Sequence, residues 1–126
     1  MSFSNYLETK VLDHVFGGTA YTAPSTLYVA LFTTDNTDSG GGTEVSGGAY
    51  ARQTATFTVS GNTATTSADI EFPTATANYG TVVAVAVMDA STGGNQLAYA
   101  GLSSDKTIET GDVFRVPACD LDITLD

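Results

Sequence analysis

The stretch G-G-G-T-E-V-S-G-G-A-Y-A-R-Q at residues 40–53 divides the chain into two parts of different character. One helical pattern and one strand pattern precede it, and a run of β-hairpin patterns follows it. The stretch is rich in glycine, includes the acidic Glu44, and leads into a strand that carries Arg52, one of four basic residues. It contains no residue pattern typical of catalysis, and shaped loops on β-scaffolds are commonly binding loops. The stretch therefore predicts a structural or binding protein.

The composition narrows the class of protein further. A length of 126 residues predicts a single domain over residues 1–126, large enough to bury a core without disulfides. The net charge of −10 argues against direct binding to nucleic acid or to an anionic membrane, because both need a cationic surface. No apolar run has the length of a transmembrane helix, and no signal-peptide pattern is present, so we expect the chain to be made in a cytoplasm.

The N-terminal part predicts one α-helix over residues 3–16. Its apolar side chains recur every four residues and form one stripe. They are Phe3, Leu7, Val11 and Val15. Ser4 or Asn5 can cap the start of the helix, and the Gly17-Gly18 pair ends it. Such a helix either covers a sheet or docks on a neighbouring subunit.

The remaining chain predicts a mainly β fold. Residues 26–34 and 80–90 are apolar on both faces, which is typical of strands covered on both sides, and 80–90 is the expected central strand. Short strands separated by turn signals indicate an antiparallel β-sandwich, or a flattened barrel, over residues 26–125.

The clearest hairpin joins residues 50–59 to residues 63–72. Gly61-Asn62 suits its two-residue turn, because such turns need positive φ angles that glycine and asparagine tolerate. This register pairs Val59 with Ala64 and Thr56 with Ser67. It also places Arg52 opposite Glu71, where opposite charges contribute about 0.2–1 kcal/mol.

Acidic side chains near the C-terminus form a candidate calcium site, since calcium binds oxygen ligands. They are Asp120, Asp122 and Asp126. The simpler interpretation, which we favour, is a solvated strand face whose charges resist edge-to-edge pairing. A second acidic group, Asp35, Asp38 and Glu44, lacks the EF-hand spacing. We therefore predict no metal and no cofactor.

Catalytic patterns are weak throughout. His14 is the sole histidine, and no serine lies in a Gly-x-Ser-x-Gly elbow. Cys119, the sole cysteine, falls on the apolar side of the last strand pattern, so we expect it in the core. The glycine-rich stretch lacks the Gly-Lys-Ser/Thr ending of a phosphate loop. We predict that the chain is not an enzyme.

Sugar stacking is the one ligand-binding alternative that the aromatic residues suggest. The candidate side chains are Tyr21, Tyr28, Tyr50, Tyr79 and Tyr99. They are scattered along the chain, and strand tyrosines more often pack than bind.

Several segments together resemble a family of short structural proteins of tailed bacteriophages, cyanophages among them. The segments are residues 6–24, 26–34, 42–53 (G-T-E-V-S-G-G-A-Y-A-R-Q), 89–97 (D-A-S-T-G-G-N-Q-L) and 120–126 (D-L-D-I-T-L-D). They follow in order over nearly the whole chain. The resemblance carries no catalytic motif.

The resemblance implies a virion protein, assembled in the host cytoplasm, with two possible roles. A capsid cement or decoration protein, commonly a homotrimer, would clamp capsomer junctions by binding the major capsid protein or other virion proteins. The alternative is a tail or tail-fibre component, or a module that binds host glycans. A tail fibre usually has a long shaft, whereas this sequence indicates one compact domain, so we expect the cement role. The helix and the glycine-rich loop are the expected contact elements, through Phe3, Leu7, Val11, Gly41, Glu44 and Gly47.

Overall fold

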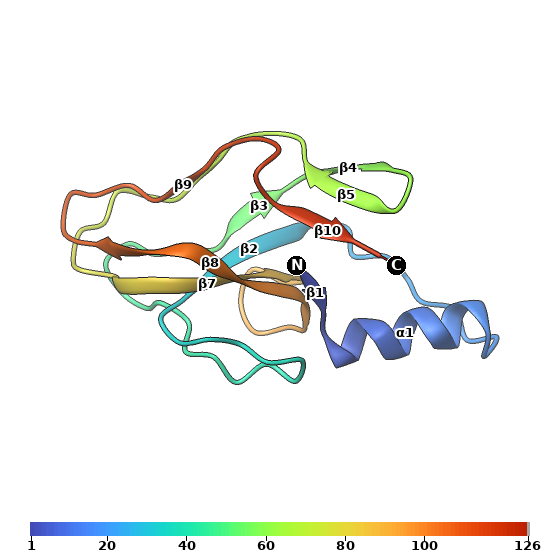
Figure 1. Cartoon of the computed structure of the whole chain (residues 1–126). Coiled ribbons are helices and arrows are strands. Elements are labelled where there is room, and N and C mark those ends of the chain that lie inside the picture. The colour runs from blue at the N-terminus through green and yellow to red at the C-terminus, as the bar shows by residue number, and fades with distance from the viewer. Residues whose placement is uncertain (126) are drawn as a thin grey trace.

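A five-stranded antiparallel sheet organises the chain in the computed structural model, which describes residues 1–125 (Figure 1). Within these residues the elements are β1 (Ser2–Phe3), α1 (Asn5–Val15), β2 (Leu27–Phe32), β3 (Gln53–Ala55), β4 (Phe57–Ser60), β5 (Thr63–Thr66), β6 (Ile70–Glu71), β7 (Gly80–Met88), β8 (Gln96–Ile108), β9 (Arg115–Val116) and β10 (Asp122–Thr124). The predicted mainly β, antiparallel fold with one N-terminal helix is confirmed, and the sheets do not close into a barrel.

The large sheet has the strand order β1-β8-β7-β2-β3. β7 pairs with both β2 and β8, so the prediction of a central strand at residues 80–90 is confirmed. β2 is buried on both faces, as its sequence indicated. Val29 and Leu31 join the main core on one face, whereas Ala30 and Phe32 join a second apolar cluster on the other.

Two smaller sheets cover one face of the large sheet. One has the order β10-β5-β4, and the other pairs β6 with β9. The main core lies between the layers, where Phe72 and Phe114 pack edge to face with ring centroids 5.8 Å apart. Burial of these apolar side chains is the main stabilising contribution, at about 25 cal/mol per Å² of apolar surface.

The predicted hairpin forms only near its turn. Val59 pairs with Ala64, and the hydroxyls of Thr56 and Ser67 lie 2.7 Å apart, as the register required. Beyond these residues the strands separate, because β3 pairs with β2 and β6 pairs with β9. The predicted pair of Arg52 with Glu71 is therefore wrong, and Glu71 lies opposite Arg115.

Helix α1 is shorter than expected, because Phe3 belongs to strand β1, which pairs with β8. The buried Ser4 caps the helix: its hydroxyl accepts a hydrogen bond from the Leu7 amide (3.2 Å) and donates one to the carbonyl of Gln96. The helix ends before Gly17-Gly18, as predicted, and Gly18 has a φ of +73°. No residue of α1 is buried. No helix within residues 1–125 is long and apolar enough to span a membrane.

The glycine-rich loop is joined to the large sheet along part of its length. The Thr33 amide donates to the Thr43 carbonyl (2.8 Å), and the Val45 amide donates to the Leu31 carbonyl (3.0 Å). Val45 is itself buried in the main core. Gly48 has a φ of +61°, and a Cβ there would lie 2.7 Å from the Ala77 carbonyl oxygen. A side chain at this position would disturb the fit of the loop against its neighbour.

Cys119 lies in a turn and not on a strand. Its amide donates to the Thr66 carbonyl (2.8 Å), and the Asp120 amide donates back to the Pro117 carbonyl (3.2 Å). Cys119 has a φ of +65° and is exposed, so the prediction of a core cysteine is wrong. The last strand therefore begins only at Asp122, and the predicted alternation holds from Leu121 to Thr124, where Leu121 and Ile123 are half-buried and Asp122 and Thr124 are exposed.

Candidate functional site

A cluster of polar side chains centred on Arg52 is the most elaborate in the described chain. Its guanidinium donates to both carboxylate oxygens of Glu44 and to the carbonyls of Ala90 and Gly93, each at 2.8 Å. The Tyr50 hydroxyl donates to Glu44 Oε2 (2.7 Å) and accepts from the Leu31 amide (3.0 Å). The cluster thus joins the glycine-rich loop to β2 and to the turn after β7.

The ionisation of this cluster suits a structural ion pair. Burial by itself raises the pKa of Glu44, but the hydrogen bonds from Arg52 and Tyr50 outweigh it, so the pKa lies below its ordinary value. The bond to Glu44 raises the pKa of Arg52, and burial together with the same carboxylate raises the pKa of Tyr50. All three groups therefore keep their ordinary charge states at neutral pH.

Two of the candidate calcium residues near the C-terminus, Asp120 and Asp122, lie within the described residues. Asp120 and Asp122 are both exposed, and Asp122 Oδ1 accepts a hydrogen bond from the Thr65 hydroxyl (2.7 Å). Asp126 lies outside the described residues. Residues 1–125 contain no group of three or more histidine, cysteine, aspartate or glutamate side chains placed to hold a metal ion.

Two residues of the second acidic group, Asp38 and Glu44, have partners within the protein. Asp38 accepts a hydrogen bond from the Tyr99 hydroxyl, and Glu44 pairs with Arg52. His14 lies in the last turn of α1, as expected, and its Nδ1 accepts from the Tyr21 amide (3.1 Å).

Two of the tyrosines considered for sugar stacking pack against each other. The rings of Tyr50 and Tyr79 meet edge to face, 5.8 Å apart, and Tyr79 is buried. Tyr50 also stacks on Phe72 with ring centroids 6.0 Å apart. These two rings therefore belong to the core.

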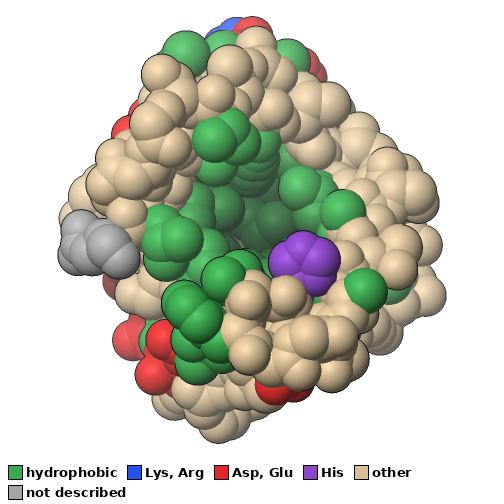
Figure 2. Space-filling model, turned by 90° about the vertical axis from the view of Figure 1, so that its right-hand side faces the viewer, with side chains coloured by type: hydrophobic (Ala, Val, Ile, Leu, Met, Phe, Trp, Pro, Cys, Tyr) green, Lys and Arg blue, Asp and Glu red, His purple; other side chains and the backbone are tan. Residues whose placement is uncertain are grey.

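An apolar groove opens between α1 and the β4–β5 hairpin, with a volume of about 360 Å³ (Figure 2). Phe3 and Leu7 form its wall on the α1 side, and Phe57 and Val59 form the wall on the hairpin side. Its floor is the buried trio Val87, Leu97 and Ala98. The other lining residues are Leu27, Gly61, Asn62, Thr63, Ala64, Ile123 and Leu125. None of these side chains carries a charge.

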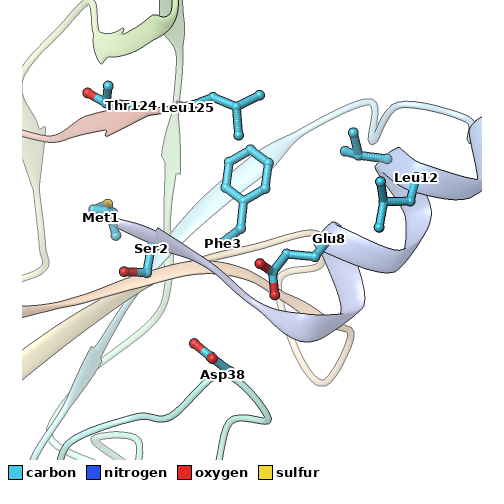
Figure 3. A pocket seen from close by; sticks show the side chains of 9 residues that line it. Met1, Ser2, Phe3, Glu8, Leu12, Asp38, Thr124 and Leu125 are labelled. Carbon is cyan, nitrogen blue, oxygen red and sulfur yellow. The ribbon is translucent and has the colours of Figure 1, made fainter. Parts of the chain in front are cut away.

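A second depression of about 500 Å³ adjoins the groove and shares Phe3 and Leu125 with it. In Figure 3 these two side chains point toward one another between β10 and α1, with Leu12 facing them from the helix. Glu8 and Asp38 also line this depression, and so does Met1, whose N-terminal ammonium donates to the Asp122 carbonyl (2.9 Å).

Exposed apolar side chains extend this surface along the helix. Leu12 is 57% exposed, Val15 60% and Phe16 82%. On the opposite side of the groove, Val59 is 72% exposed and Leu125 50%. The apolar stripe of α1 thus lines the groove at its start and projects into solvent at its end. We call the groove and these five side chains the apolar end of the molecule.

The predicted contact residues divide between this surface and others. Phe3 and Leu7 line the groove, and Val11 lines the adjoining depression. Gly41 and Gly47 are exposed outside both, and Glu44 is held by Arg52. Whether any of these six residues contacts a partner stays a prediction.

Sequence reasoning missed Val59, Phe57 and Leu125 as surface residues. The predicted hairpin register paired Val59 with Ala64, and this pair forms in the structure. Because β4 and β5 belong to a smaller sheet and not to the large one, the apolar side of the hairpin opens onto the groove.

Comparison of the sequence with known proteins relates this chain to a family of bacteriophage proteins. No curated protein matches the sequence significantly. The family model described as podophage GP4 fiber I protein gp80 matches residues 2–124, nearly the whole chain. The chain therefore belongs to this family of bacteriophage structural proteins.

Proposed function

We propose that this chain is a tail-fibre component of a podophage-type virion and acts by non-covalent assembly. The supporting observation is the family match over residues 2–124, whose description names a fibre protein. This match favours the tail-fibre role, which the sequence analysis gave as the alternative, over the capsid cement role, which it expected. The cyanophage, cement and trimer features of the resemblance have no such support.

The groove between α1 and the β4–β5 hairpin suits an assembly role. It is hollowed, uncharged and flanked by exposed apolar side chains, which monomeric proteins seldom gather in one place. Covering it would remove apolar surface from water and stabilise a contact by about 25 cal/mol per Å². The proposal assigns the chain no catalytic step, no metal and no cofactor.

The proposed partners are proteins of the virion. With a net charge of −10 and only four lysine and arginine residues, the chain has little positive charge with which to bind phosphates, so nucleic acid and anionic membranes are poor partners. Host glycans remain an alternative partner if the fibre contacts the cell surface through this chain.

Locating the protein on purified virions tests the proposal. We expect antibodies raised against the purified chain, labelled with gold, to mark the tail or its fibres in electron micrographs. Labelling spread over the capsid shell would contradict the proposal and restore the cement role. Virions treated with antibody that has been pre-absorbed on the purified chain provide the control.

A further inference from the structure

We propose that a polar pocket between the glycine-rich loop and the turn after β7 binds a neutral carbohydrate. The pocket has a volume of about 340 Å³, and its lining comes from residues 44–47, 50–52 and 91–93. This volume lies within the usual range of small-ligand sites. The inference rests on the proposed fibre function, and it names a site and a ligand class for the host-glycan contact which that function allows.

The backbone beside the pocket has an uncommon conformation. Gly47, Gly48 and Ala49 follow one another with positive φ angles of +76°, +61° and +69°. Ala49 is one of two residues other than glycine with a positive φ among residues 1–125. The Tyr50 amide donates to the Gly47 carbonyl and the Thr76 amide to the Gly48 carbonyl, each at 2.9 Å. Backbone strain of this kind persists where the surrounding structure enforces it, and it is concentrated at ligand-binding sites.

The ion pair of Arg52 with Glu44 leaves one donor and one acceptor for a ligand. A guanidinium has five N–H groups. Within the described chain, four of those of Arg52 donate to Glu44 and to two carbonyls, which leaves one N–H on Nη2. Glu44 Oε2 accepts from both Arg52 and Tyr50, whereas Oε1 accepts from Nη2 alone. Both residues line the pocket, and a hydroxyl can use both groups because it donates and accepts.

Charge and exposed hydroxyls define the class of ligand. Ser46, Ser91 and Thr92 line the pocket with exposed side chains, so their hydroxyls are open to a ligand. An anion would meet the Glu44 carboxylate and a cation would meet the Arg52 guanidinium, whereas a neutral group meets an ion pair whose charges offset each other. An apolar ligand would leave these polar groups without partners. A neutral sugar ring, which carries several hydroxyls and no charge, suits the pocket on each count.

An NMR titration of the ¹⁵N-labelled full chain tests the site. Glucose, galactose and mannose are added separately, and we expect at least one of them to shift the amide signals of residues 44–52 and 91–93 selectively. The uronic acid and the amino sugar that correspond to the bound sugar should bind more weakly, because each adds a charge. No selective shifts with any of the three sugars would overturn the inference, and so would equal or tighter binding of the uronic acid.

Removal of hydroxyls locates the site on the surface. Ser91→Ala combined with Thr92→Val should raise the dissociation constant of the bound sugar by about tenfold. The control is Ser60→Ala combined with Thr58→Val, which removes two exposed hydroxyls from β4 and should leave the constant unchanged. Because all four positions are exposed, both double variants should keep the melting temperature of the wild type. Equal affinities of the two double variants would contradict the placement. Both tests use purified protein, so their failure is distinct from a failure to find the chain on the tail.

Discussion

Arg52 shows how one side chain can join two segments of this fold. Its side chain is only 7% exposed, and its partners come from the glycine-rich loop and from the turn after β7. A planar guanidinium can donate to a carboxylate and to two carbonyls at once, which lysine cannot do. The loop therefore depends on a specific residue as well as on its glycines.

Replacing Arg52 with methionine should lower the free energy of unfolding by about 3 kcal/mol. The substitution leaves the partly buried Glu44 carboxylate without its cation and leaves the carbonyls of Ala90 and Gly93 without their donor. Urea denaturation measures the change. The matched control is Arg115→Met, because Arg115 pairs with Asp69 on the surface, with side chains 53% and 49% exposed. That change should cost at most about 1 kcal/mol, and equal losses would refute the structural role given to Arg52.

The lowered pKa of Glu44 predicts how the stability of the folded chain depends on pH. Its pKa in the folded chain lies below the ordinary value of 4.5, so its stabilising contribution is complete above 4.5 and is lost as the pH falls through the lower folded value. Glu44→Gln removes this contribution. We expect the stability difference between wild type and variant to be largest at neutral pH and to shrink in acid. Denaturation series from neutral pH to below 4.5 measure it, and a difference independent of pH would contradict the assignment.

At the scale of elements, the β4–β5 hairpin depends on its turn. Gly61 has a φ of +60°, as the first residue of such turns requires, and nothing lies within 4 Å of a Cβ placed there. The Gly61→Ala variant should therefore lose about 1–3 kcal/mol through backbone strain alone. Gly101→Ala is the control, because its φ is not in the left-handed region and its Cβ would make ordinary contacts at 3.9 Å. Thermal unfolding should give a lower melting temperature for Gly61→Ala than for Gly101→Ala. Equal melting temperatures of the two variants would contradict the backbone strain at residue 61.

Ser4 links the helix to the large sheet. Its hydroxyl caps α1 at the Leu7 amide and also donates to Gln96 at the start of β8. Ser4→Ala should lower the free energy of unfolding by about 1–2 kcal/mol, since it removes the helix cap and leaves the partly buried Gln96 carbonyl with one donor fewer. Faster hydrogen exchange of the Leu7 amide would report the loss of the cap. Ser2→Ala, at an exposed position on the preceding strand, should change neither stability nor exchange.

At the scale of the whole molecule, burial separates the side chains that stabilise the core from those at the apolar end. Phe72 is 1% exposed in the main core, whereas Phe16 is 82% exposed. Phe72→Ala should lower the free energy of unfolding by about 3–5 kcal/mol, because it removes a buried ring and leaves a cavity. Phe16→Ala should change it by less than about 0.5 kcal/mol, because that ring is already in contact with water. Urea denaturation measures both changes, and equal losses would contradict this division.

The sequence by itself determined the local features of this protein. The apolar runs of β2 and β7 predicted strands buried on both faces, the fourfold stripe predicted α1, and Gly61-Asn62 predicted the turn and the register beside it. Each of these depends on periodicity or on backbone angles within a short segment, so neighbouring residues suffice to predict it. The tail-fibre alternative likewise came from segments of the sequence itself.

Only the tertiary structure decided which strand pairs with which. Beyond Thr56 and Ser67 the hairpin strands separate, because pairing β3 with β2 and β6 with β9 completes two other sheets. Because the strands separate, Arg52 pairs with Glu44 and the groove opens beside Val59. A turn at residues 117–120 leaves Cys119 exposed. These outcomes depend on competition among distant segments for hydrogen bonds and apolar surface, which no single stretch of sequence contains.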